Sequence, residues 1–206
     1  LSDLKILSKY FLKIKSEIIK NIKNSNSCFL KNHSAFLKYY GNDFTNIEKN
    51  QGLIYIVRDP RDIAVSLSDH MNIGIDASIK FMLNKNASLQ YTGVEKKNSK
   101  IKLPMMIGSW NIKLNSWTFL NVPKLLIRYE DLISNKEKII KQVINFFEKH
   151  YDIIFNNFDN KIKNIMISTE FNTLKNNEKK LGFKESIKDQ SFFNVGKSKQ
   201  WEKKLS

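Results

Sequence analysis

One stretch of the chain, residues 53–70, constrains the fold most, because it predicts a buried strand that runs directly into a helix. The strand is the apolar run LIYIV at residues 53–57, which is typical of a strand covered on both faces in a parallel sheet. Helix-start signals follow at once. Asp59 can act as the N-cap, Pro60 suits the first helical position, and Asp62 takes the acid position of a capping box. The stretch predicts one strand–helix unit of an α/β sheet.

The turn of this unit has the chemistry of an anion site. Arg58 ends the strand and Ser66 lies near the second turn of the helix, and open α/β sheets bind ligands at the carboxyl ends of their strands. A guanidinium forks onto phosphate oxygens, a hydroxyl adds a donor, and a helix N-terminus favours negative charge. The alternative interpretation is a capped helix with a solvated cluster of Arg and Asp.

The rest of the chain repeats the alternation of strand and helix. The apolar run at residues 122–132 predicts a second buried strand, and Ser134 with Glu137 predicts a capping box for the next helix. This order favours a parallel sheet with right-handed crossovers. Weaker patterns predict helices over about 3–23, from 110 and from 162 towards 171, a short strand at 28–30 and a polar loop at 41–52. We expect an irregular binding loop over 72–108 and a loop over 172–192.

Length and charge limit the possible classes of protein. A chain of 206 residues can build one sizeable core, so we expect a single domain over residues 1–206. The formal net charge of +15 suits nucleic acid, an anionic membrane surface or a phosphorylated ligand. However, Lys is scattered among Asp and Glu and is abundant together with Asn and Ile, as in proteins from AT-rich genomes. The charge alone is therefore weak support for a nucleic-acid-binding protein.

The compartment is predicted from cysteine usage and from hydropathy. Cys28 is the single cysteine, so an internal disulfide is excluded and the chain fits a reducing compartment. No apolar run approaches the roughly 20 residues of a membrane span, and no signal peptide is visible at the start. We predict a cytoplasmic protein.

Two short motifs together resemble those of the PAPS-dependent sulfotransferases. The segment RDPRD at residues 58–62, with Ser66 eight positions after Arg58, resembles the segment by which this family holds the 3′-phosphate of its nucleotide. Lys31-Asn32-His33 resembles the family's Lys-x-His segment, in which the histidine is the catalytic base. An acceptor hydroxyl needs a base with a pKa near neutrality, and a nearby lysine can stabilise charge on the transferred sulfuryl group.

Four further residues match family positions at the nucleotide. Tyr129 stands in the Tyr-Glu-Asp segment, and Thr169 and Phe171 match a helix end that contacts the adenine, although core packing explains Phe171 equally well. Gly196, in FNVGKSKQW, matches a late segment that closes over the 3′-phosphate. Asn and Val replace its usual basic residues, and Lys197 and Lys199 can supply that charge instead. Upstream, the spacing of Trp110 and Trp117 matches a family scaffold pattern.

The family's Gly-rich loop for the 5′-phosphosulfate has no counterpart here, because residues 1–40 contain no glycine. We expect this loop upstream of residue 1 in the full gene product, and a trimmed C-terminal end. The alternative is a degenerate chain without the loop.

The resemblance implies a P-loop-kinase-like α/β sulfotransferase fold with a parallel sheet flanked by helices. It implies sulfuryl transfer from PAPS to a hydroxyl or amine of a small-molecule, lipid or sugar acceptor, which releases PAP. In this reading His33 is the base, Lys31 assists it, and the nucleotide contacts Arg58, Ser66, Tyr129, Thr169, Phe171 and Gly196. No metal is implied, because no His, Cys or carboxylate cluster has ligand spacing. The alternatives are an inactive PAP-binding fragment or interaction module and, less favoured, a nucleic-acid-binding domain with steep salt dependence.

Overall fold

The computed structural model describes residues 29–39, 42–43, 52–90, 104–183, 186 and 191–205. They fall into two units, each described by itself below. The first unit comprises residues 1–51 and 81–122, and the second comprises residues 52–80 and 123–206. The predicted helix over 3–23 and the predicted place of Cys28 lie outside the described residues.

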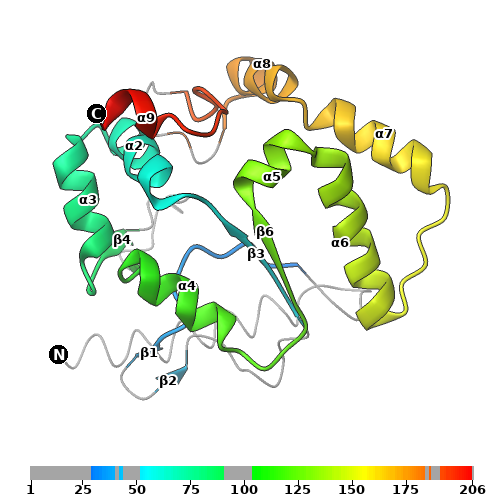
Figure 1. Ribbon diagram of the computed structural model, residues 1–206, viewed down its shortest axis with the longest axis horizontal. Helices are drawn as coiled ribbons and strands as arrows, with labels where there is room; N and C mark the ends of the chain where they lie inside the picture. Colours follow the sequence, from blue (N-terminus) through cyan, green and yellow to red (C-terminus); the bar gives the residue numbers. More distant parts are fainter. Residues whose placement is uncertain are drawn as a thin grey trace, which may run out of the picture. The chain divides into compact units, whose positions relative to one another are not determined.

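A parallel pair of strands is the centre of the second unit. β3 (Leu53–Val57) pairs with β6 (Lys124–Arg128), with Leu53 opposite Lys124 and Val57 opposite Arg128. Figure 1 shows these strands side by side, with their last residues at the same end. The predicted parallel α/β sheet is confirmed. The predicted burial of both faces is wrong in degree, because Ile127 is buried whereas Ile56 and Leu126 remain about half exposed.

Helices surround this pair and account for most of the second unit. Their bounds are α2 Pro60–Met71, α3 Ile75–Leu83, which runs on into the first unit, α5 Tyr129–Ser134, α6 Lys136–Tyr151, α7 Phe158–Ser168, α8 Phe171–Leu181 and α9 Trp201–Lys204. Among the helices of the described residues, none is long and apolar enough to cross a membrane.

Helix α2 begins as its sequence predicts, but its capping differs. Asp59 is the N-cap, and its carboxylate accepts a hydrogen bond from the Arg61 N–H at 2.9 Å. In a capping box Asp62 would accept from the Asp59 N–H. Instead, Glu130 accepts from that N–H at 2.9 Å, and Asp62 bonds elsewhere. The capping-box prediction for Asp62 is therefore wrong.

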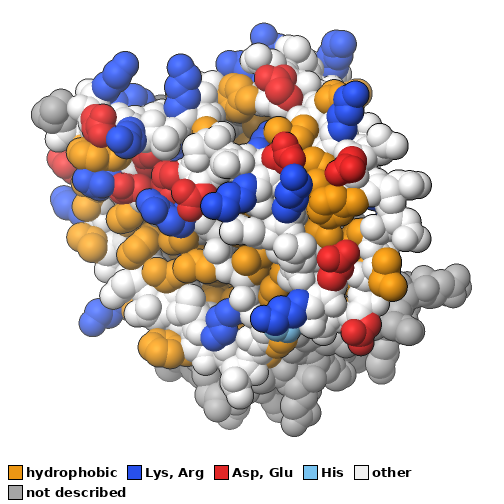
Figure 2. All heavy atoms as spheres, turned by 45° about the vertical axis from the view of Figure 1, so that its right-hand side comes forward, with side chains coloured by type: hydrophobic (Ala, Val, Ile, Leu, Met, Phe, Trp, Pro, Cys, Tyr) orange, Lys and Arg blue, Asp and Glu red, His pale blue; other side chains and the backbone are white. Residues whose placement is uncertain are grey.

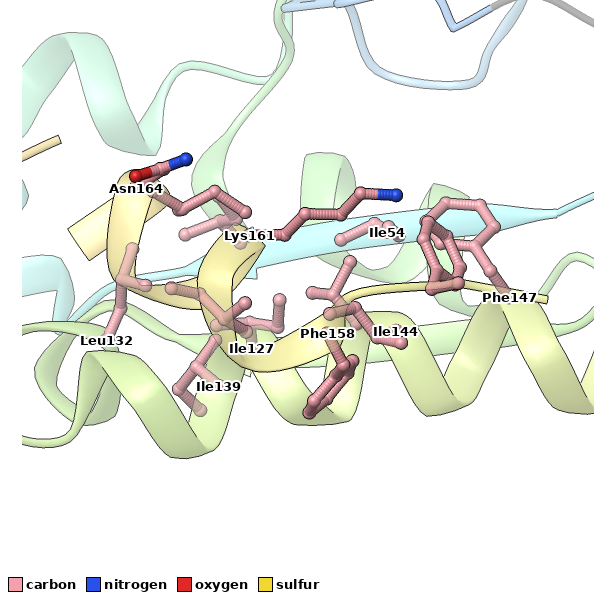
Figure 3. A pocket seen from close by; sticks show the side chains of 14 residues that line it. Ile54, Ile127, Leu132, Ile139, Ile144, Phe147, Phe158, Lys161 and Asn164 are labelled. Carbon is pink, nitrogen blue, oxygen red and sulfur yellow. The ribbon is translucent and has the colours of Figure 1, made fainter. Parts of the chain in front are cut away.

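Helices α6 and α7 face the sheet across an apolar cavity of about 660 Å³ (Figure 3). Ile54, Ile127 and Ile144 are among the apolar side chains that line it, and Lys161 and Asn164 of α7 are polar members of the lining. Ile139, Ile144 and Phe146 give α6 its buried face. The apolar spacing that predicted this helix thus corresponds to its core contacts.

Other boundaries differ from those predicted in the second unit. The second strand ends at Arg128 instead of residue 132, because Tyr129 already begins α5. Asn135, rather than Ser134, caps α6, and it accepts from the Lys138 N–H at 3.3 Å. The predicted loop from residue 172 is in fact helix α8. Its sequence FNTLKNNEKKL is polar on most faces, so the apolar pattern was too weak to indicate a helix.

The described residues of the first unit form short strands, helix α4 and the end of α3. Their bounds are β1 Lys38–Tyr39, β2 Asn42–Asp43, β4 Ser88–Gln90, β5 Pro104–Met106 and α4 Trp110–Thr118. β1 pairs with β2 and β4 with β5, both antiparallel. The region 72–108, expected to be irregular, therefore contains α3, β4 and β5, and β2 falls in the expected loop 41–52. Phe29 and Leu30 are exposed and lie in no strand, so that prediction is wrong.

Candidate functional site

The carboxyl end of the β3–β6 pair carries Arg58 and Tyr129. Each is the residue that follows its strand, and the strands' last residues, Val57 and Arg128, are paired in register. The guanidinium carbon of Arg58 lies 4.5 Å from the centre of the Tyr129 ring. Such a cation–π contact orients the guanidinium without using any of its N–H groups. The sheet register thus brings these two predicted site residues together.

Arg58 is held by backbone and carboxylate oxygens, and its side chain is only 17% exposed. Nη2 donates to the Lys197 carbonyl at 3.0 Å and lies 3.8 Å from Oδ2 of Asp62. Nε is buried and has no hydrogen-bond partner among the described residues. An arginine offers five N–H donors in a planar fork, so these contacts orient the group and leave donors for a further acceptor.

The segment 196–201 lies against the start of α2 and is fastened there by Asp62. This carboxylate is fully buried. Its Oδ2 accepts from the Lys199 N–H at 2.7 Å and its Oδ1 from the Trp201 N–H at 3.2 Å. The Arg61 guanidinium carbon also lies 3.6 Å from the centre of the Trp201 ring. Lys197, Lys199 and Trp201 thus come next to the Arg58 turn from far along the sequence.

Gly196 makes a close contact with Phe171 that other residues could not make. A Cβ at Gly196 would lie 2.3 Å from a carbon of the Phe171 ring, and its φ of +63° is in the left-handed region. Both facts favour glycine. The Phe171 ring is half-buried, and the Phe193 ring lies at 6.4 Å from it, edge-on. The structure therefore brings together Phe171 and Gly196, two predicted site residues from separate motifs.

Ser66 and Thr169, two further predicted site residues, are both exposed, unlike Arg58. Ser66 is exposed on α2, one turn after Asp62. Thr169 ends α7, and its hydroxyl donates to the Ile165 carbonyl at 2.6 Å. The ammonium of Lys136 donates to the Thr169 carbonyl at 2.6 Å. The Thr169 hydroxyl already has a helical partner, so it can face a ligand only as an acceptor or after breaking that bond.

Comparison with known proteins identifies the family. A family model described as "Sulfotransferase domain" matches residues 10–206. The chain belongs to the sulfotransferase domain family. The comparison with curated proteins found no significant match.

Solved structures agree with this sulfotransferase assignment at the level of fold. One is the mouse sulfotransferase SULT7A1 complexed with PAP, with 24% identity, a TM-score of 0.50, and coverage of 74% of this chain and 52% of that one. Two structures of retinol dehydratase, one with androsterone and PAP and one with retinol and PAP, are 16% and 15% identical, each with a TM-score of 0.61 and coverage of 93% of this chain. The chain spans about half the length of each of these proteins.

The predicted catalytic pair, Lys31 and His33, lies in the first unit. Both side chains are exposed, and the segment that follows them is anchored. The Ser34 carbonyl accepts from the Trp117 indole N–H at 2.8 Å, and Ala35 N–H donates to the Met106 carbonyl at 2.8 Å. Ser34 and Ala35 are buried. The segment that carries His33 is thus fixed at its carboxyl side by a tryptophan of the predicted scaffold spacing.

Two contacts of the site had no signal in the sequence. Asp62, predicted to be the acid of a capping box, instead accepts from the N–H groups of Lys199 and Trp201. Lys197 reaches Arg58 through its backbone carbonyl rather than through its charge. Among the described residues, no group of His, Cys, Asp or Glu could hold a metal ion. Over the face drawn in Figure 2, Lys and Arg side chains are scattered among Asp and Glu instead of forming one continuous patch.

Glu178 of α8 fastens the loop before the segment 196–201. Its carboxylate accepts hydrogen bonds from the Ser186 and Ser191 hydroxyls and from the N–H groups of Phe192 and Phe193. Desolvation alone would raise the pKa of this carboxyl, but the hydrogen bonds outweigh desolvation and lower the pKa to about 2. The two phenylalanine rings pack on Phe183. The loop is therefore tied to α8 by a charged acceptor and an aromatic cluster.

Acid should release this loop. Because the folded pKa of Glu178 lies below that of an unfolded glutamate, about 4.3, the interaction is fully present above about pH 5 and is lost as the pH falls towards 2. Glu178→Gln should reduce amide-exchange protection at Phe192 and Phe193 at pH 7, whereas Glu137→Gln, which alters an exposed ion pair on α6, should not. Equal protection in wild type and Glu178→Gln would contradict the prediction.

Proposed function

We propose that this chain binds the nucleotide of PAPS and transfers its sulfuryl group to an acceptor hydroxyl or amine. The observation that carries the proposal is the juxtaposition of Arg58, Tyr129 and the segment 196–201 at the carboxyl end of β3 and β6. This is the edge at which α/β sheets bind ligands. The family membership and the PAP named in the titles of the similar structures support the choice of nucleotide.

In this proposal the 3′-phosphate is held by Arg58 and Ser66, with Lys197 and Lys199 nearby as further positive charges. A guanidinium whose Nη2 is already directed by a carbonyl can present its other N–H groups as a fork to phosphate oxygens. The Phe171 ring, placed against Gly196, suits the face of an adenine. Tyr129 orients Arg58. Thr169, which caps the end of α7 two residues before Phe171, is proposed to contact the adenine beside that ring.

The transfer step follows from in-line displacement at sulfur. The acceptor oxygen or nitrogen forms a bond to sulfur, the bond between sulfur and the bridging phosphate oxygen breaks, and PAP leaves with that electron pair. His33 takes the proton of the acceptor, and Lys31 stabilises the negative charge that develops on the sulfuryl and bridging oxygens. The acceptor is proposed to be a small molecule, a lipid or a sugar. A cytoplasmic location and a single domain over 1–206 stay predictions.

Calorimetric titration of the 206-residue chain with PAP tests the proposal. We expect binding with one-to-one stoichiometry that is at least about tenfold tighter than that of 5′-AMP, which lacks the 3′-phosphate, because charged hydrogen bonds contribute roughly 1.5–3 kcal/mol each. Equal affinity for the two nucleotides, or no binding by a folded chain, would reject the site. Binding without turnover of PAPS would favour the inactive PAP-binding module, and steep weakening by salt across many phosphates would favour nucleic acid.

A further inference from the structure

Asp62 stands out because it is a fully buried carboxylate whose hydrogen bonds join two distant segments. Its oxygens accept from the N–H groups of Lys199 and Trp201, which are 137 and 139 residues away, and Oδ2 also lies 3.8 Å from Nη2 of Arg58. A buried carboxylate is unfavourable unless it is paired and hydrogen-bonded. These three contacts satisfy Asp62 and place it between Arg58 and the segment 196–201.

The backbone at Lys199 is held in a conformation that a lysine seldom adopts. Its φ is +60°, in the left-handed region that costs energy for residues with a Cβ. The shortest of the Asp62 hydrogen bonds, at 2.7 Å, is the one from the Lys199 N–H. The turn also directs the Lys197 carbonyl to Arg58 at 3.0 Å. Asp62 therefore stabilises the shape of the segment that orients Arg58.

A purely architectural link between α2 and the end of the chain would not need Asp62. Asp69, on the same helix, already forms an ion pair with Lys204 of α9 at 2.9 Å. That pair is partly exposed and joins α2 to α9. Asp62 joins α2 to the same late part of the chain, and its carboxylate also lies 3.8 Å from Nη2 of Arg58.

We propose that Asp62 is a positioning residue for the 3′-phosphate, which it serves by fixing Arg58 and the segment 196–201 in their binding geometry. This inference rests on the proposed function. The expected effect of neutralising Asp62 on phosphate binding is opposite to the effect of its charge alone. A carboxylate beside an anion site repels the anion, so its neutralisation should tighten phosphate binding if charge alone matters. If Asp62 positions the site, neutralisation should weaken binding instead.

The test compares Asp62→Asn with Asp69→Asn in the 206-residue chain. Affinities for PAP and 5′-AMP are measured by calorimetry and by NMR titration at millimolar nucleotide. We expect Asp62→Asn to weaken PAP binding by roughly tenfold, since two hydrogen bonds to a charged acceptor are altered, and to leave 5′-AMP within about twofold. Asp69→Asn should leave both affinities within about twofold.

Several outcomes would overturn the inference. Unchanged or tighter PAP binding by Asp62→Asn would do so, as would an equal loss for both nucleotides, which is the sign of general loosening. If the wild type binds PAP and Asp62→Asn binds it with the same affinity, this inference alone is rejected. If the wild type binds no PAP, the proposed function is rejected and the inference with it.

A measurement on the wild type decides the matter if Asp62→Asn does not fold. We expect PAP to slow amide hydrogen exchange at Lys199 and Trp201, the two N–H groups bonded to Asp62, and 5′-AMP to leave it unchanged. Exchange at these two amides that is indifferent to PAP would overturn the inference.

Discussion

Replacing Arg58 by alanine is expected to weaken PAP binding by about 100-fold, corresponding to roughly 3 kcal/mol. The side chain is mostly buried, and the Lys197 carbonyl and the Tyr129 ring direct it. A bound phosphate would gain charge-assisted hydrogen bonds from a group whose orientation is already fixed, so little ordering is needed on binding. Calorimetric titration with PAP measures the loss.

Two further variants separate the contribution of the paired N–H donors of Arg58 from the contribution of its positive charge. Arg58→Lys keeps the positive charge but not the planar pair of donors, and we expect it to lose about tenfold in affinity. Lys141→Ala removes one positive charge from an exposed ion pair on α6 and should change PAP affinity by less than about twofold. A folded Arg58→Ala protein that binds PAP as wild type does would show that the phosphate site lies elsewhere.

Replacing His33 by alanine is expected to slow sulfuryl transfer by about 100-fold or more while PAP affinity stays within about twofold. General-base catalysis is worth on the order of 10²–10⁴ in rate, and in the proposed function His33 contacts the acceptor rather than the 3′-phosphate. The measurement is turnover of PAPS with a panel of phenols, alcohols, sugars and amines, beside calorimetry with PAP.

The control for His33 is His150→Ala, which removes an exposed histidine at the end of α6. It should leave both turnover and PAP affinity unchanged. If His33→Ala turns over PAPS as fast as wild type, another group accepts the proton. If wild type turns over none of the acceptors although it binds PAP, the chain is better described as a PAP-binding module.

Local sequence patterns were enough to predict the centre of the second unit. The apolar run at 53–57 and the Asp-Pro start of the next helix involve only neighbouring residues, so strand, turn and helix could be located from the sequence. The position of Arg58 at the end of its strand followed directly. The family motifs then indicated Tyr129 and Gly196, which the fold places with Arg58 and Phe171 respectively.

The pairing of carboxylates with distant N–H groups could not be predicted in this way. Asp62 has the local pattern of a capping acid, yet its partners are Lys199 and Trp201. The Asp59 N–H bonds to Glu130, 71 residues away. The capping-box rule pairs the Asp62 carboxylate with the Asp59 N–H, but in the fold each of these groups bonds to a residue distant in the sequence. The weak apolar periodicity of α8 and the short strands of residues 72–108 were missed because their signals are small beside the polar background.

The contacts that complete the Arg58 turn also fix when it can form. Arg58 and Asp62 leave the ribosome long before Lys197, Lys199 and Trp201, their partners 137 to 139 residues later. Closing so long a loop carries an entropic cost and tends to come late in folding. A nascent chain can build β3 and α2 but has no partner for the buried Asp62 carboxylate until this late segment is made. In the proposed function, nucleotide binding at this turn should accordingly follow the synthesis of residues 197–201.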